Sequence, residues 1–317
     1  MSHTPAARPE EIRHSFADVN GVRLHYASAG ADAAAAGSAS SATGAAASAS
    51  RLIIFLHGFP EFWYAWREQL VEFGRDYFAV APDMRGYNLS SKPAEIERYE
   101  IAQLVGDVRA LVTHLGAKSC VLVGHDWGGV VAWAAAIACP DVVEKLVIIN
   151  SPHPGIFQRE LAENPAQQQA SQYMLVFRSP EAEAILSANN FAPMQDSILG
   201  EGLRRGYFTE ADRRAYVEAW SQPGAATAMI NYYRFAVRHG SGEIRPIAAP
   251  TLVIWGGSDR FLGPTLAEPH HDDVPNLDRV ERLPDASHWV HHDEAERVNQ
   301  LLIDFFAPAL PAKNPAR

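Results

Sequence analysis

The chain is poor in cysteine, with Cys120 and Cys139 the two among its 317 residues. Both lie in apolar surroundings, so we expect reduced, packed thiols in a cytoplasmic protein and no disulfide framework. The chain also lacks an apolar run of about 18 residues, so no membrane-spanning helix is expected. Residues 1–16 are polar and contain no hydrophobic segment of the kind that signal peptides carry.

Basic charge is scarce as well. The 27 Lys and Arg residues are outnumbered by 37 Asp and Glu residues, which gives a formal net charge of −10. Nucleic acids are bound by clusters of Lys and Arg that neutralise phosphates, so nucleic-acid binding is not expected. By contrast, 47% of the residues are hydrophobic, which allows a sizeable core. The length fits an α/β core with one insertion.

Short apolar runs alternate with helical segments along most of the chain. The N-terminal segment is expected to form a hairpin, because 14–19 and 22–28 flank Asn20-Gly21, a strong turn signal. Later apolar runs predict buried strands at 52–56, 78–81, 120–123, 146–149, 251–255 and near 278–283. The spacing of apolar residues predicts helices at 64–73, at 101–115, after Gly128 and at 293–306. This alternation predicts a mostly parallel sheet of about eight strands with helices on both faces.

The alternation is interrupted by a long segment without strand patterns. Helical segments rich in Gln, Glu, Arg, Tyr and Met occupy 152–243, which we expect to be a helical cap. The α/β core would then consist of 14–151 and 244–310. Ligands of open α/β sheets bind beyond the carboxyl ends of the strands, so such a cap would cover the site. Residues 31–50 are mostly Ala, Ser and Gly and are expected to form a flexible loop.

The segment 123–129, Val-Gly-His-Asp-Trp-Gly-Gly, has the pattern of a nucleophile elbow. An apolar strand precedes it and a helix of small apolar residues follows it. In such an elbow the glycines allow a sharp, strained turn that raises one side chain above the sheet. The raised residue is usually serine, but here it is Asp126. A carboxylate needs no base to attack carbon, so this residue points to chemistry other than that of a serine esterase.

Three further polar segments are expected at the carboxyl ends of strands. They are His-Gly-Phe-Pro at 57–60, Asp259 in Trp-Gly-Gly-Ser-Asp, and His288 in Ala-Ser-His-Trp. Each of these segments, taken alone, could simply be a solvated loop. The order nucleophile, acid, histidine is that of an α/β-hydrolase triad. Asp126, Asp259 and His288 are therefore the predicted triad.

With these motifs the chain resembles the α/β-hydrolase superfamily and, within it, the epoxide hydrolases. The resemblance runs from about His14 to Phe306, interrupted mainly by the Ala/Ser-rich segment. Its motifs are His-Gly-Phe-Pro-Glu at 57–61, Asp-Met-Arg-Gly-Tyr at 83–87 with Ser-Lys-Pro at 91–93, Gly-His-Asp-Trp-Gly-Gly at 124–129, and Ser-His-Trp at 287–289. One departure is Asn88, where the family usually has glycine. Asparagine tolerates a positive φ, so we expect the turn to be kept.

The resemblance implies a two-step hydrolysis without a cofactor. Asp126 would attack an epoxide carbon and form an alkyl-enzyme ester. His288, oriented by Asp259, would activate the water that hydrolyses this ester. Backbone N–H groups of Phe59 and Trp127 would form the oxyanion hole.

Epoxide opening also requires an acid at the ring oxygen, because an alkoxide is a poor leaving group. In the family a pair of cap tyrosines supplies this acid, and Tyr173 and Tyr233 match the pair. A phenol with a pKa near 10 donates a hydrogen bond and then a proton to a developing alkoxide. The expected cap also contains Tyr207, Tyr216 and Tyr232. Of these, Tyr232 is the alternative to Tyr233.

The remaining aromatic residues and histidines have less specific interpretations. The large apolar side chains Phe62, Trp63 and Trp220 are predicted to line the substrate pocket, although plain core packing would explain them equally well. The His-His pairs at 270–271 and 291–292 show no HExxH or comparable spacing, so we expect solvated loop histidines and no metal. Supporting roles behind the elbow and the oxyanion loop are expected for His57 and His125.

Two alternatives to an epoxide hydrolase stay open. A haloalkane dehalogenase shares the aspartate nucleophile, and the indole of Trp127 could bind halide, but those enzymes resemble this chain less around Phe59. A non-catalytic ligand-binding protein of the same fold would have no need for an intact triad. The expected partners are a small apolar epoxide and water, without nucleic acid or membrane. A homodimer is the candidate assembly.

Overall fold

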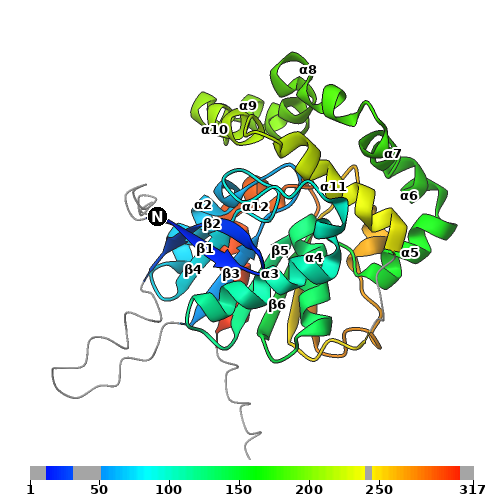
Figure 1. The fold of residues 1–317 in the computed structure, drawn as a ribbon. Coiled ribbons are helices and arrows are strands. Elements are labelled where there is room, and N and C mark those ends of the chain that lie inside the picture. Colours follow the sequence, from blue (N-terminus) through cyan, green and yellow to red (C-terminus); the bar gives the residue numbers. More distant parts are fainter. Residues whose placement is uncertain (1–11, 31–50, 240–244, 308–317) are drawn as a thin grey trace, which may run out of the picture.

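The computed structural model describes residues 12–30, 51–239 and 245–307. Its centre is an eight-stranded sheet in the order β1-β2-β4-β3-β5-β6-β7-β8 (Figure 1). The strands are β1 (Arg13–Val19), β2 (Val22–Ala29), β3 (Leu52–Leu56), β4 (Phe78–Pro82), β5 (Cys120–His125), β6 (Val143–Ile149), β7 (Thr251–Gly256) and β8 (Leu277–Leu283). β2 pairs antiparallel with both β1 and β4, and the pairs from β4 to β8 are parallel. The prediction of a mostly parallel sheet is confirmed.

β1 and β2 form the predicted hairpin. Val19 pairs with Val22, and the intervening Asn20 and Gly21 have φ angles of 48° and 72°. Asn and Gly adopt such left-handed conformations most readily, and a two-residue turn of this kind fits the twist of the flanking strands. The segment 31–50, predicted to be a flexible loop, lies outside the described residues.

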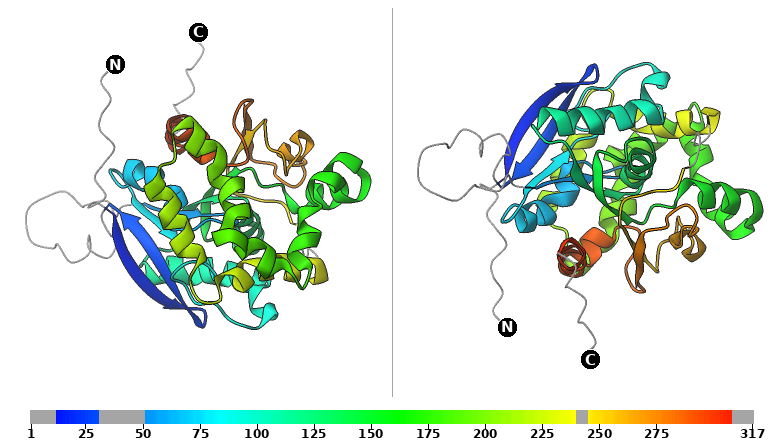
Figure 2. Two further views of the ribbon diagram at one scale, coloured as in Figure 1. Left: turned by 90° about the horizontal axis from the view of Figure 1, so that it is seen from above. Right: turned by 90° about the horizontal axis from the view of Figure 1, so that it is seen from below.

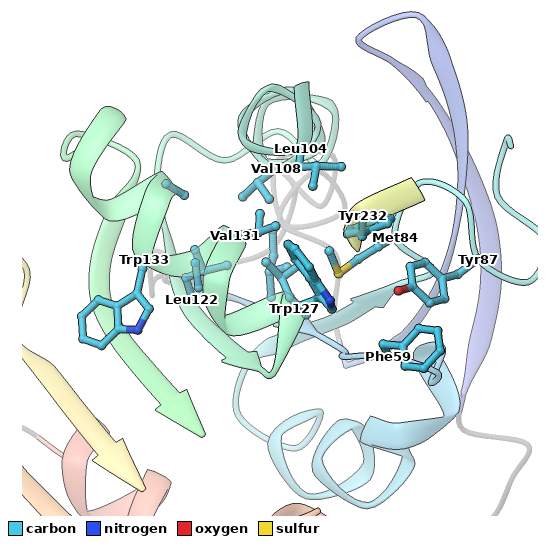
Figure 3. Close-up of a cluster of buried hydrophobic side chains, with 14 of the residues drawn as sticks. Phe59, Met84, Tyr87, Leu104, Val108, Leu122, Trp127, Val131, Trp133 and Tyr232 are labelled. Atoms are coloured by element: carbon cyan, nitrogen blue, oxygen red, sulfur yellow. The ribbon is translucent and has the colours of Figure 1, made fainter. Parts of the chain in front are cut away.

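Helices cover both faces of the parallel strands, as the view from below in Figure 2 shows. Successive residues of a strand point to opposite faces, so β3 places Ile54 and Leu56 in one apolar cluster and Ile53 and Phe55 in another. The first cluster, part of which is drawn in Figure 3, includes residues of α3 (Ile101–His114) and α4 (Trp127–Ala138). The second includes residues of α2 (Arg67–Phe73) and α13 (Ala295–Phe306). Burial on both faces explains why these strands are continuous apolar runs.

Two helices differ from the prediction at their starts. The helix expected at 64–73 begins with the short 3₁₀ helix η2 (Trp63–Trp66) and continues as α2. The helix expected at 293–306 is divided at Glu294, whose φ of −133° is not helical, into α12 (Val290–Asp293) and α13. Two more 3₁₀ helices, η3 (Ile96–Tyr99) and η5 (Pro264–Ala267), lie in connections.

In the described part of the chain, helices without strands connect β6 to β7. They are α5 (Pro154–Glu163), α6 (Pro165–Ala170), α7 (Tyr173–Arg178), α8 (Ala182–Met194), the π-helix η4 (Gln195–Leu199), α9 (Gly200–Arg205), α10 (Glu210–Trp220) and α11 (Ala225–His239). These inserted helices, green to yellow in Figure 1, lie together over one end of the sheet. The domain limits at 151/152 and 243/244 stay a prediction. Among the described helices, none is long and apolar enough to cross a membrane.

Candidate active site

Asp126 lies at the sharp turn between β5 and α4. Its backbone angles, φ 48° and ψ −118°, are rarely adopted by residues other than glycine. A Cβ atom on Gly124 would lie 2.4 Å from the carbonyl oxygen of Gly128, and one on Gly128 would lie 2.2 Å from that of Leu56. Only glycines allow the chain to pass so close to β3. Trp127 is the first residue of α4, so its N–H belongs to the helix N-terminus, which favours an anion.

The loop after β3 donates a hydrogen bond to this carboxylate. The backbone N–H of Phe59 lies 2.8 Å from Oδ1 of Asp126. A Cβ on Gly58 would lie 2.5 Å from Cβ of Asp126, so glycine permits the close approach. Nε2 of His57 accepts a hydrogen bond from the N–H of Met84 over 2.9 Å and so holds the loop from behind. The loop thus presents one preformed donor to Asp126.

An acid and a histidine meet Asp126 at the same edge of the sheet. Asp259 follows β7 and His288 follows β8, and Nδ1 of His288 donates to Oδ2 of Asp259 over 2.7 Å. Nε2 of His288 lies 3.6 Å from Oδ2 of Asp126. Oδ1 of Asp259 accepts backbone N–H groups from Phe261 and Leu262 at 2.7 and 3.0 Å. The structure therefore brings the three predicted triad residues together.

Asn150, absent from the predicted site, supports Asp259. It follows β6 directly, and its Nδ2 donates to Oδ2 of Asp259 over 2.7 Å. Its Oδ1 accepts the N–H of Gly256 over 2.8 Å. The available signal was an asparagine at the carboxyl end of a parallel strand, where ligands of such sheets bind.

Two carboxylates determine the protonation of His288. Burial disfavours the imidazolium, but the charges of Asp259 and Asp126 outweigh burial and raise the pKa of His288 to about 10. Burial also opposes ionisation of Asp259, yet the facing imidazolium holds the pKa of Asp259 below its usual value. At neutral pH the resting site therefore contains an imidazolium between two carboxylates.

Tyr173 and Tyr233 face the nucleophile from the inserted helices. Tyr173 begins α7 and Tyr233 lies on α11, and both line the same cavity as Asp126. Burial above all, with the charge of Asp126 contributing, raises the pKa of both phenols. Both therefore stay protonated and can donate. Tyr232, shown in Figure 3, instead donates its hydroxyl to the carbonyl oxygen of Arg85 over 2.7 Å.

The other two tyrosines of the inserted helices are engaged elsewhere. The hydroxyl of Tyr207 donates to Oδ1 of Asp293 over 2.7 Å, and that of Tyr216 donates to Oε1 of Glu61 over 3.1 Å. Neither residue lines the cavity that contains Asp126. Tyr173 and Tyr233 are thus the two tyrosines that this cavity brings to the nucleophile.

The cavity at Asp126 has a volume of about 190 Å³. Apart from Asp126, His288 and the two tyrosines, Ser197 is the polar residue among the described ones that line it. The remaining wall is aromatic or aliphatic, with contributions from Phe59, Pro60, Phe177, Ile185, Leu186, Pro193, Met194, Phe261 and Trp289. A small, uncharged, apolar ligand suits such a lining.

Phe62, Trp63 and Trp220, predicted to line the pocket, do not belong to this lining. Phe62 packs its ring against Tyr64 and Tyr216, and Trp63 packs edge-on against His14. The indole of Trp220 donates to the carbonyl oxygen of Pro60. These side chains fill contacts around η2 and α10 instead. Two residues that do line the cavity are close in sequence to predicted site residues: Phe177 lies one turn after Tyr173, and Trp289 follows His288.

The prediction that 291–292 are solvated histidines is wrong. His291 and His292 are 1% and 8% exposed. The reason is the short helix α12, which packs the His291 ring against Trp66 and the His292 ring against Phe208. His270 and His271, by contrast, are exposed as expected.

The chain is similar to known proteins over nearly its whole length. The family model for the alpha/beta hydrolase fold matches residues 51–295. The chain is 39% identical over 300 residues to an AB hydrolase superfamily protein of Bacillus subtilis (strain 168), covering 93% of this chain and 98% of that protein. It is 36% identical over 312 residues to epoxide hydrolase 4 of Homo sapiens, covering 96% of this chain and 82% of that protein.

Solved structures agree with this relationship. The crystal structure of a Bacillus megaterium epoxide hydrolase in complex with an inhibitor aligns with a TM-score of 0.81 at 37% identity, covering 92% of this chain and 99% of that chain. The chain therefore belongs to the α/β-hydrolase family, and the predicted fold is confirmed. Within that family, it belongs with the epoxide hydrolases.

The ion pair at His288 predicts a pH-dependent stability. Because the pKa of His288 rises from 6.5 to about 10 on folding, its contribution is complete below pH 6.5 and is lost as the pH rises toward 10. We expect the free energy of unfolding in urea to fall more between these pH values for the parent than for His288→Gln. His270→Gln, at an exposed position, controls for loss of a histidine. If the free energy of unfolding changed with pH in the same way for the parent and for His288→Gln, the raised pKa of His288 would be contradicted.

Proposed function

We propose that this protein hydrolyses a small apolar epoxide to a vicinal diol through a covalent ester on Asp126. The observation that carries the proposal is one apolar cavity in which a carboxylate on a nucleophile elbow faces two protonated phenols. The carboxylate can attack a carbon atom while the phenols bind the oxygen that leaves it. Kinship with epoxide hydrolases supports the same chemistry.

In the first step Asp126 opens the ring. Oδ1 is held by the N–H of Phe59 at 2.8 Å, so Oδ2 is the oxygen that attacks an epoxide carbon and forms the ester bond. The carbon–oxygen bond of the ring breaks, and its electron pair stays on the oxygen. Tyr173 and Tyr233 donate hydrogen bonds to this developing alkoxide, which takes a proton from one of the two phenols. The phenolate that remains is reprotonated when His288 gives up its proton.

In the second step water cleaves the ester. Forming the ester removes the charge of Asp126, one of the two carboxylates that raise the pKa of His288. The imidazolium then gives up its extra proton to the phenolate more readily, and the neutral imidazole accepts a proton from water, while Asp259 stabilises the cation that forms again. The hydroxide adds to the ester carbonyl, and the N–H groups of Phe59 and Trp127 stabilise the oxyanion. The intermediate then collapses: the bond between the carbonyl carbon and the alkoxide oxygen of the ester breaks, and this oxygen takes the proton from His288 to give the diol. The carboxyl group of Asp126 returns its proton to His288, which restores the resting ion pair.

The inserted helices act in this proposal as a cap. They supply both phenols and much of the apolar wall, so they exclude water while the ring opens and select the substrate. Among the residues that the structure describes, no charged side chain other than those of the triad lines the cavity. The expected substrate is therefore an uncharged, apolar epoxide, and the chemistry requires no cofactor.

Two other functions are less well supported. A haloalkane dehalogenase would use the same aspartate, but a departing halide needs no proton, so the two buried phenols facing Asp126 would have no role. A non-catalytic ligand-binding protein would not need the strained backbone at Asp126 together with a histidine and an acid at hydrogen-bond distance from each other.

The two tyrosines distinguish epoxide opening from halide displacement. Tyr173→Phe and Tyr233→Phe should each slow diol release from styrene oxide by about 10²–10³-fold, since each removes a donor to developing charge. Any halide release from 1-bromobutane should change far less. The hydroxyl of Tyr64 donates to Asp212 away from the cavity. The control variant Tyr64→Phe should therefore keep the parent rate. Parent rates on styrene oxide in both single variants would contradict this role and favour the dehalogenase.

Replacing the base should separate the two steps. His288→Gln should still form the ester but hydrolyse it about 10²–10⁴-fold more slowly, because it lacks a general base. Intact-protein and peptide mass spectrometry should then find an adduct with the mass of styrene oxide on the peptide that contains Asp126. The double variant Asp126→Asn/His288→Gln is the control and should carry no adduct. The absence of an adduct in His288→Gln would exclude His288 as the hydrolytic base.

A further inference from the structure

Behind the catalytic histidine, the structure contains a buried cluster of side chains that the proposed reaction does not use. Glu61 lies in the loop after β3, His125 ends β5, and His291 and His292 lie on α12. Glu61, His125 and His291 are each at most 1% exposed. One potential ligand atom from each of these three residues lies within 4.8 Å of the other two. The cluster therefore has the residue types and the spacing of a metal site.

The hydrogen bonds of His125 leave one of its nitrogens facing a carboxylate. Nε2 of His125 lies 2.9 Å from the backbone carbonyl oxygen of His288. A carbonyl oxygen only accepts, so Nε2 carries a proton. Nδ1 lies 3.1 Å from Oε2 of Glu61, and in a neutral imidazole it would be an acceptor as well. Two acceptors at this separation need either a shared proton or a metal ion between them.

His291 favours the metal ion over the proton. Its Nε2 lies 3.4 Å from the same Oε2 of Glu61, yet neither ring nitrogen has a hydrogen-bond partner. A second proton on His125 would leave this buried ring unsatisfied, which is costly. A metal ion would use its free lone pair.

We propose that Glu61, His125 and His291 form a binding site for a divalent metal ion of the zinc type. Imidazole nitrogens and a carboxylate oxygen are ligands that zinc prefers. A tetrahedral zinc with bonds of about 2.1 Å places neighbouring ligand atoms about 3.4 Å apart. The nitrogens of His125 and His291 lie 3.1 and 3.4 Å from Oε2 of Glu61. In the proposed site a water molecule supplies the fourth ligand.

The surroundings are those expected of metal ligands. The bond from His125 to the carbonyl of His288 fixes the tautomer that exposes Nδ1. Oε1 of Glu61, which the ion does not use, lies 2.7 Å from Nε2 of His292 and 3.1 Å from the hydroxyl of Tyr216. A bound ion would thus connect the loop of His288 with α12 and, through Tyr216, with α10. Its role is to stabilise the folded chain without contacting the substrate.

Zinc uptake by the full-length protein tests this site. Protein purified without a metal column, stripped with EDTA and dialysed against ZnCl₂ should retain about one zinc per chain in elemental mass spectrometry, with a Tm that rises with zinc concentration. Cobalt in place of zinc should give the visible absorption of a four-coordinate Co²⁺ site.

A matched pair of variants places the ion. The ring centroid of His291 lies 4.6 Å from that of Trp66. His291→Phe keeps an aromatic ring at this place but removes both nitrogens, so zinc uptake and the Tm shift should be lost. His270→Phe, the same change at an exposed position, should keep both. If His291→Phe does not fold, His291→Asn takes its place.

Two results would overturn the metal site. Equal zinc uptake by the parent and the His291 variant would mean that the ion is held elsewhere, for example between Asp126 and His288. A parent protein that retains no zinc would mean that the cluster shares protons only. Either result leaves the proposed hydrolysis untouched, because that activity is measured on metal-free protein as diol release.

Discussion

The active site depends on the close backbone contact that shapes the turn at Asp126. Gly58, Gly124 and Gly128 each lie where an added Cβ would come within 2.5 Å of a neighbouring atom. This contact holds Asp126 at φ 48°, a conformation that costs of order 1–3 kcal/mol for a residue with a side chain. In return, the carboxylate reaches the N–H of Phe59 and the cavity. The other groups of the site are useful only because this carboxylate is fixed.

The sheet and the inserted helices contribute different parts of the proposed chemistry. The ends of the parallel strands carry the nucleophile, the acid and the base, while α7 and α11 carry the two phenols. Charges in a cavity with an apolar wall interact more strongly than in water, so the carboxylates at Asp126 and Asp259 control the proton on His288. Most of the cavity wall belongs to the inserted helices and to loops. Substrate preference can therefore vary there without change to the triad.

Much of this arrangement is predictable from the sequence, and the exceptions share one cause. The elbow, the triad and the sheet follow from local patterns and from the order of motifs along the chain. Tyr232 and Tyr233 are neighbours in sequence, and only the rotation of α11 against the sheet decides which of them faces Asp126. The burial of His291 likewise depends on α12 packing against Trp66. Such contacts join segments that are distant in the sequence, so neither composition nor spacing reveals them.

A single-turnover experiment in heavy-oxygen water tests the covalent role of Asp126 most directly. Enzyme in excess over styrene oxide is allowed to react once, and the diol and the peptide containing Asp126 are then analysed by mass spectrometry. The account predicts that the first diol carries no label, because its new oxygen comes from the carboxylate, and that the label enters Asp126. Label in the diol and none in Asp126 would mean direct attack by water and would contradict the account.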